Sequence, residues 1–227
     1  MDTKKLIEEV LLDLGNNKSL TDVSSKIQII VRLLGDEKLK SWYTCEFVTG
    51  YKDQELPDYR ISRAVDIKAN YIIPQGFGAW KLSGQSVPVA NLGLEKYKEI
   101  MTVRFCDTIS AIIEYSKHPE DVAMSLSPYE QMLVQKVLGE AHIQNVHKVL
   151  SPSTFQTIID NVQGRIIDMF MDLNERIFNG ELDLKSDSAK KEIHQVITNN
   201  ITAGIVQTGA GTIEANNATI AAKIEQS

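Results

Sequence analysis

The sequence predicts a mainly helical α+β protein, with a helical body, a small β element and a β-rich repeat tail. Three observations predict it. Apolar residues recur at helical spacing over 4–49 and 94–184, glycine and proline interrupt a strand-like stretch between them, and residues 193–213 contain no Lys, Arg, Asp or Glu. We therefore expect an N-terminal domain at 1–93, a helical region at 94–184, and a linker with a β-rich oligomerisation tail at 185–227.

Residues 4–49 are expected to form three amphipathic helices that pack together, because none can bury its apolar stripe alone. A glycine follows each apolar stripe, which is typical of helix C-terminal caps, and these are Gly15, Gly35 and Gly50. The second helix has three candidate N-terminal caps, namely Ser19, Thr21 and Asp22.

Residues 51–93 predict one or two short strands, and a hairpin of that size needs support from the helical part. Residues 94–184 predict helices again, with one continuous apolar stripe from Leu94 to Ile113. Ser127-Pro128 and Ser151-Pro152 each place proline in the first turn of a helix.

The C-terminal stretch contains a seven-residue repeat. No Lys, Arg, Asp or Glu occurs between Glu192 and Glu214, and the segments 201–207, 208–214 and 215–221 align. We interpret them as short β rungs that several chains share, since seven extended residues span only about 23 Å. A flexible tail is the alternative, and the isoleucines argue against it. The predicted oligomerisation residues are Ile201, Ile205, Val206, Ile213 and Ile220.

Composition restricts the partners and the compartment. Lys plus Arg is 24 and Asp plus Glu is 30, so the net charge of −6 argues against nucleic acid as a partner. No apolar run reaches the roughly 18 residues of a membrane span, and acids occupy the place of a signal-peptide core. We therefore predict a cytoplasmic protein without a membrane partner. Cys45 and Cys106 are expected to be buried free thiols.

Known catalytic and cofactor-binding motifs are missing from the sequence or incomplete in it. The chain has no G-x-x-x-x-G-K-[ST] and no G-x-S-x-G, and His142 and His147 are five residues apart where a helical zinc pair needs four. Asp168, Asp172 and Glu175 would share a helix face, either as a solvated stripe or as ligands of a divalent ion. We predict no cofactor, no metal site and no enzymatic activity.

One stretch of the N-terminal domain carries a family resemblance. It runs from Trp42 to Arg60 and is similar to the pattern W-x(3)-E-[LF]-x(2)-G-Y…LP-x-Y-R of the AbiTii domain. The matching residues are Trp42, Glu46, Gly50, Tyr51, Leu56, Pro57, Tyr59 and Arg60. The similarity extends to about Asn91, and the helix at Ser151-Pro152-Ser153 resembles the region that follows this domain. The resemblance implies abortive-infection defence against phage and supplies no catalytic residues.

The same residues predict a local geometry without the resemblance. Trp42 and Glu46 lie one helical turn apart, and Gly50 can take a positive φ that ends the helix. Pro57 then makes the return turn rigid, so that Arg60 can pair bidentately with Glu46. Such a pair acts either as a structural clasp or as part of a functional pocket.

These observations lead to one functional hypothesis and two alternatives. The first is a non-enzymatic defence protein that forms homo-oligomers through its tail and recognises a phage product or a defence-system partner through its helical body. The second is a metal-dependent toxin acting on nucleic acid through Asp168, Asp172 and Glu175. The third is an adaptor or antitoxin-like subunit of a larger complex.

Overall fold

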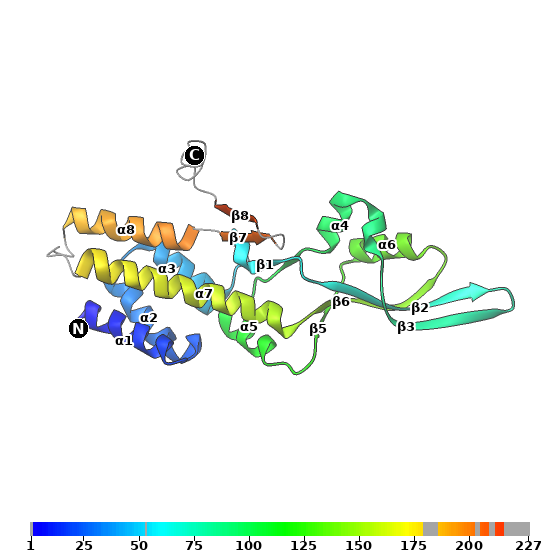
Figure 1. The fold of residues 1–227 in the computed structure, drawn as a ribbon, viewed down its shortest axis with the longest axis horizontal. Coiled ribbons are helices and arrows are strands. Elements are labelled where there is room, and N and C mark those ends of the chain that lie inside the picture. The colour runs from blue at the N-terminus through cyan, green and yellow to red at the C-terminus, as the bar shows by residue number, and fades with distance from the viewer. Residues whose placement is uncertain (1, 53, 179–185, 203–204, 209–211, 216–227) are drawn as a thin grey trace. The chain divides into compact units, whose positions relative to one another are not determined.

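Local capping signals set the first helices of the computed structural model, which describes residues 2–52, 54–178, 186–202, 205–208 and 212–215 (Figure 1). Helix α1 spans Thr3–Gly15, α2 spans Leu20–Leu34 and α3 spans Glu37–Thr44. Ser19 caps α2 through a capping box with Asp22, and Gly35 ends it in the left-handed region at φ 65°. The three predicted N-terminal helices are confirmed.

The chain divides into two compact units whose segments interleave along the sequence. Unit 1 comprises Met1–Arg60, Cys106–Ile112 and Ile158–Ser227, and unit 2 comprises Ile61–Phe105 and Ile113–Thr157. The predicted boundaries near residues 93 and 184 do not follow this division. Contacts between segments distant in sequence define the units, and periodicity along the chain does not report such contacts.

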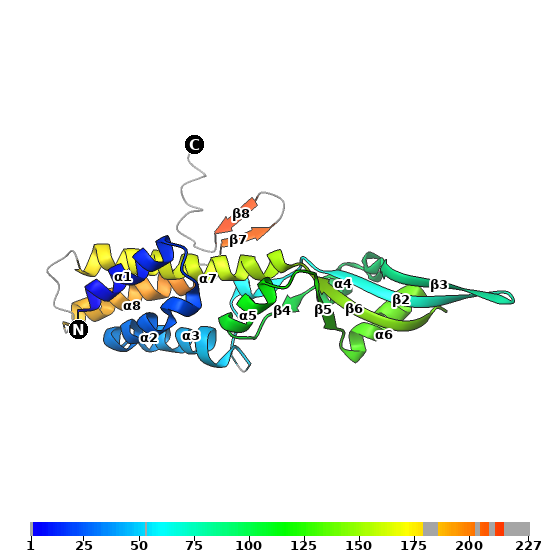
Figure 2. The same cartoon turned by 90° about the horizontal axis from the view of Figure 1, so that it is seen from below.

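Unit 1 is helical. Besides α1 to α3 it holds the π-helical turn η1 (Cys45–Thr49), the 3₁₀ turn η2 (Asp58–Arg60) and the start of α5 (Ile109–Ser116). It also holds most of α7 (Pro152–Leu173), the π-helical turn η4 (Asn174–Phe178) and α8 (Asp187–Thr202). Figures 1 and 2 both show α8 beside α7. Side chains from α1, α2, α7 and α8 fill the core, including the fully buried Ile7, Ile27, Phe170 and Ile197.

Helix α8 corrects the prediction that residues 185–227 are a linker and a β-rich tail. Residues 187–202 form a helix whose buried face carries Ala189, Ile193, Val196 and Ile197. Asp36 of the α2–α3 loop contacts His194 of α8, with 2.7 Å between the carboxylate oxygen and Nδ1. Tertiary packing thus overrides the low helix propensity of its Thr, Asn and β-branched residues.

Unit 2 is built on a four-stranded antiparallel sheet of order β3-β2-β6-β5. Its strands are β2 (Asp66–Gln75), β3 (Gly78–Ser86), β5 (Val122–Ser125) and β6 (His142–Leu150). A separate pair joins β1 (Ile61–Ser62) to β4 (Val103–Arg104). The small antiparallel sheet confirms the α+β class.

Short helices cover one face of this sheet. They are the 3₁₀ turn η3 (Val89–Leu92), α4 (Leu94–Ile100) and α6 (Pro128–Leu138). Ile67 and Ala69 of β2 pack in one buried cluster with Ile100 of α4 and with Leu133 and Val134 of α6. This cluster is the hydrophobic core of unit 2.

The predicted all-helical stretch over 94–184 is wrong in three places. Residues 122–125 and 142–150 are strands, and the apolar stripe from Leu94 to Ile113 is interrupted by β4 and by the loop after it. Strand β6 forms because it pairs with β2, about seventy to eighty residues earlier in the chain, and such a partner is invisible to local periodicity. The two helices predicted to start at Ser127-Pro128 and Ser151-Pro152 are confirmed as α6 and α7.

The last described residues form an antiparallel backbone hairpin of β7 (Ile205–Thr208) and β8 (Thr212–Ala215). Val206 pairs with Glu214 and Gln207 pairs with Ile213, so the ladder does not place Val206 opposite Ile213 as a stack of seven-residue rungs would. Residues 216–221 of the third repeat, with the predicted oligomerisation residue Ile220, lie outside the described residues.

Among the described residues, no helix combines the length and the hydropathy needed to cross a bilayer.

Candidate functional site

A buried carboxylate organises the most polar part of unit 1. Glu46, in the π-helical turn η1, and Arg60, at the end of η2, are both completely buried and form an ion pair. The hydroxyls of Tyr51 and Tyr59 donate to the other carboxylate oxygen of Glu46 over 2.7 and 2.5 Å. The indole N–H of Trp42 donates to the Tyr59 hydroxyl at 2.9 Å. We call these five residues the Glu46 cluster.

The expected ion pair between Glu46 and Arg60 is present, but it is not bidentate. Nη2 of Arg60 contacts Oε2 of Glu46, whereas Nη1 donates to the backbone carbonyl of Asp107 at 2.8 Å. The two tyrosine hydroxyls occupy Oε1 instead. The guanidinium also lies over the ring of Tyr51, 5.5 Å from its centroid. Arg60 therefore joins the motif to the distant Cys106–Ile112 segment, which the sequence did not predict.

Gly50 brings that distant segment into place. It ends η1 with a φ of 75°, and a Cβ at this position would overlap the carbonyl oxygen of Cys106. The same carbonyl accepts a hydrogen bond from the Tyr51 N–H at 2.7 Å. The glycine of the motif is thus required both by its conformation and by the close approach of the Cys106 backbone.

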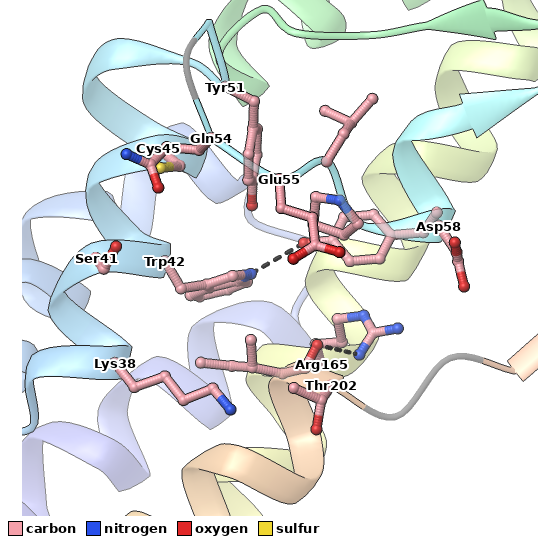
Figure 3. A pocket seen from close by; sticks show the side chains of 14 residues that line it. Lys38, Ser41, Trp42, Cys45, Tyr51, Gln54, Glu55, Asp58, Arg165 and Thr202 are labelled. Atoms are coloured by element: carbon pink, nitrogen blue, oxygen red, sulfur yellow. Dashed lines mark hydrogen bonds between the residues drawn. The ribbon is translucent and has the colours of Figure 1, made fainter. Parts of the chain in front are cut away.

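A pocket of about 460 Å³ opens beside the Glu46 cluster (Figure 3). We call it the Trp42 pocket. Its walls come from α3, the loop before η2, α7 and the end of α8. The lining residues are Lys38, Ser41, Trp42, Cys45, Tyr51, Gln54, Glu55, Leu56, Pro57, Asp58, Tyr59, Arg165, Ile201 and Thr202.

Arg165 of α7 fixes one wall of the Trp42 pocket. Its Nη1 donates to the carbonyls of Asn200 and Ile201 at 2.6 and 3.1 Å, in the last turn of α8. A cation at this point stabilises unpaired helix carbonyls. The same guanidinium lies over the ring of Tyr59, 4.5 Å from its centroid. Arg165 therefore connects α7, α8 and the Glu46 cluster.

Three groups that line the pocket, Cys45, Tyr51 and Tyr59, have raised pKa values that favour their protonated forms. Burial, and then the nearby charge of Glu46, raise the pKa of the Tyr51 and Tyr59 hydroxyls above the ordinary value of 10. The same two causes raise the pKa of the Cys45 thiol above its ordinary value of 9. A protonated thiol is a poor nucleophile, so these groups act at neutral pH as hydrogen-bonding or packing groups.

The structure brings the eight motif residues of the sequence analysis into one region. Glu46, Gly50 and Arg60 make the buried framework, while the lining of the Trp42 pocket includes the other five, Trp42, Tyr51, Leu56, Pro57 and Tyr59. Ile201, predicted as an oligomerisation residue, lies in the last turn of α8, half-buried, and lines the same pocket.

Two contributors to the site were missed by sequence reasoning. Arg165 lies about a hundred residues from the motif, and Asp107 contributes only a backbone carbonyl. The only available signal was that Arg165 is the one basic residue of helix 152–173, and this gives no partner. One cysteine expectation also fails, because Cys45 is buried whereas Cys106 is exposed.

The three acids considered for metal binding do not form a metal site. Asp168 and Glu175 are exposed, whereas Asp172 accepts a hydrogen bond from Asn200 at 3.0 Å and contacts Arg176 at 3.6 Å. No group of three or more His, Cys, Asp or Glu side chains that could hold a metal ion occurs within the described part of the chain.

The fold and the site define a class of protein: an α+β chain whose helical unit carries a buried Glu–Arg–Tyr cluster beside a surface pocket. Comparison with family models then gives a match to AbiTii over residues 5–198, and the chain belongs to the AbiTii family. No curated protein matches the sequence, and no solved structure matches the fold.

Proposed function

We propose that the chain is a cytoplasmic abortive-infection protein that acts against phage by binding. In this proposal the Trp42 pocket recognises a phage product or a defence partner, and the C-terminal segment assembles copies of the chain. Membership of the AbiTii family suggests the defence role. The proposal that it acts by binding rests on the Trp42 pocket.

One observation carries the choice of binding over catalysis. Three nucleophilic groups line the Trp42 pocket beside Glu46, namely Cys45, Tyr51 and Tyr59, and each has its pKa shifted upward, away from the reactive anion. Glu46 is buried, with both carboxylate oxygens already bonded within its cluster, and is therefore poorly placed to accept a proton from a ligand. An aromatic wall beside polar side chains suits recognition.

The lining favours a ligand with both an apolar surface and polar groups. Trp42 and Leu56 offer apolar area, Lys38 and Arg165 offer positive charge, and Figure 3 shows the Lys38 and Arg165 side chains on the same side of Trp42. The exposed carboxylates of Glu55 and Asp58 also line the pocket. A polypeptide segment with an aromatic or aliphatic anchor and charged flanks fits this lining better than a uniformly charged polymer.

Phage plating tests recognition through the pocket. Ser41→Trp fills the pocket from an exposed position, and Lys38→Glu reverses a charge at its rim. We expect each variant to lose at least about tenfold in protection while its melting temperature stays near wild type. Lys40→Glu on the same helix is the matched control, because Lys40 is exposed and does not line this pocket. Full protection by both pocket variants would show that the pocket does not recognise the trigger.

Light scattering tests assembly through the C-terminal segment. Val206→Asp combined with Ile213→Asp changes both hairpin strands in the full chain. We expect wild type to be oligomeric at micromolar concentration and the double variant to be a monomer. A second sample ending at Thr202 retains all of α8, which a shorter chain would cut. Monomeric wild-type protein would refute assembly and leave recognition to be judged by the plating result.

A further inference from the structure

The β2–β3 hairpin of unit 2 carries an exposed apolar end. The last residue of β2 that pairs with β6 is Ile72, opposite His142, so residues 73–80 extend past the third strand as a two-stranded ribbon. Figures 1 and 2 show this end of the hairpin reaching beyond β6 and α6. All eight residues are exposed, and we call them the hairpin tip.

The side chains of the hairpin tip are unusual for a solvated turn. Phe77, beside Gly76 at the turn, is fully exposed, and Trp80 is 64% exposed. Ile73, directly opposite Trp80 in the ladder, is 41% exposed. Single exposed apolar residues are common on surfaces, but an aromatic pair beside an isoleucine on one projecting ribbon marks an interaction surface.

The charges around the hairpin tip select the partner. Between Asp66 and Glu95 the only charged residues are Lys68 and Lys81, so residues 67–94 carry +2. The whole chain carries −6, and the remainder therefore carries −6 − 2 = −8. Lys81 pairs with Ile72 just behind the tip. Glu140, two residues before His142, is the acid that adjoins the tip-side start of β6.

From these observations we propose that the hairpin tip is a membrane-surface anchor that inserts Phe77 and Trp80 shallowly into an anionic phospholipid bilayer. Tryptophan combines an apolar ring with an N–H donor, which suits the headgroup boundary. Lys81 lies four residues, about 14 Å, from Phe77, so a tip inserted by roughly 5–10 Å brings its ammonium near the lipid phosphates. Nucleic acid would require more cations than the hairpin supplies.

The backbone limits the depth of this contact. Beyond Ile72 both ribbon edges lack a neighbouring strand within the described residues, and unpaired backbone N–H and C=O groups are costly in hydrocarbon. The tip therefore enters only the hydrated headgroup region. The sequence predicted no membrane partner on the ground that it has no spanning segment, and a surface contact of this kind requires none. The inference is independent of the Trp42 pocket.

Vesicle flotation of the full chain tests the proposal. The probe is vesicles of 70% phosphatidylcholine and 30% phosphatidylglycerol. We expect wild-type protein to float with them. The partition coefficient of the variant Phe77→Ser/Trp80→Ser should be lower by about tenfold or more. Met132→Ser is the matched control, because Met132 is an exposed apolar residue of α6 in the same unit (66% exposed) and should leave flotation unchanged. Lys81→Gln should weaken binding about fivefold on these vesicles and little on pure phosphatidylcholine.

Tryptophan fluorescence gives a second measurement that needs no destabilising change. The chain has two tryptophans, and Trp42 is buried whereas Trp80 is exposed. We expect the emission of wild type to shift to the blue when vesicles are added, and the shift to vanish in Trp80→Phe. Absence of flotation, or flotation that Phe77→Ser/Trp80→Ser does not weaken, would overturn the proposal. A blue shift of Trp80 emission that depends on protein concentration in the absence of vesicles would also overturn it. Binding of duplex DNA that requires the hairpin tip would overturn it as well.

Discussion

The carboxylate of Glu46 and the guanidinium of Arg60 form an ion pair with no exposed surface on either side chain. Breaking such a pair costs more than the pair contributes, because it leaves one charge buried and uncompensated. We expect Arg60→Met to lower the free energy of unfolding by about 3–5 kcal/mol. Urea denaturation followed by circular dichroism measures this.

A double variant separates the pair from the packing around it. Glu46→Gln/Arg60→Met removes both charges and retains an amide for the Tyr51 and Tyr59 hydroxyls. It should therefore be more stable than Arg60→Met alone. Glu114→Gln, which removes an exposed pair with Lys117, should cost under about 1 kcal/mol. Equal losses in the single and double variants would contradict the role given to the charge.

Gly50 and Gly35 provide a matched comparison of two glycines with positive φ. The Cβ of Gly35→Ala meets no atom within 4 Å. This variant should therefore lose only the free energy of holding alanine in the left-handed region, about 1 kcal/mol. Gly50→Ala adds an overlap with the Cys106 carbonyl, so we expect a larger loss, on the order of 3 kcal/mol or more. Thermal unfolding of the two variants checks this, and similar losses would show that the Cys106 segment yields easily.

Lys148 and Glu130 give unit 2 a stability that depends on pH. Lys148 is buried, and its ammonium lies 2.6 Å from the Glu130 carboxylate, which also accepts the Ser127 N–H at 2.8 Å. Burial alone would raise the pKa of Glu130, but the hydrogen bonds from Lys148 and Ser127 outweigh it and hold the pKa below 4.5. Because the folded-state pKa is lowered, the stabilisation is complete above the unfolded-state value and is lost as the pH falls through the folded-state pKa.

Denaturation between pH 7 and pH 3 tests this linkage. Wild-type stability should fall steeply below about pH 4.5, and Glu130→Gln should be less stable at pH 7 and flatter with pH. Glu114→Gln serves again as the exposed control and should keep the wild-type profile. If Glu130→Gln retained the full acid dependence, other carboxylates would be responsible.

The two cysteines should differ in reactivity. Cys106 is exposed, whereas Cys45 is buried beside the Trp42 pocket and has a raised pKa, because of burial first and the Glu46 charge second. A thiol reagent such as DTNB at pH 8 should modify one thiol rapidly in native protein and the second only upon unfolding. In Cys106→Ser the fast phase should disappear. A fast phase that persists in that variant would place Cys45 within reach of the reagent.

Much of the site within 42–60 could be predicted because its residues are close in sequence. Trp42 and Glu46 are one helical turn apart, and the turn at Pro57 returns Arg60 within fourteen residues. Charge complementarity therefore predicted the ion pair, but not its geometry, since the tyrosine hydroxyls that compete for Glu46 depend on side-chain placement. Asp107 and Arg165 approach only through tertiary contacts, so neither the backbone partner of Arg60 nor the pocket wall at Arg165 had a local signal.

The sequence by itself determined the helix boundaries at Gly35 and Ser127, the α+β class and the family, because caps, periodicity and motifs are local, whereas the structure chose Ser19 among three candidate caps of α2. Only the tertiary structure decided that residues 142–150 are a strand and that 187–202 are a helix, since both depend on partners far along the chain. It also decided the interleaving of the two units. A sheet ladder and a packed helix face gain their stability from non-local burial, and that outweighs intrinsic propensity.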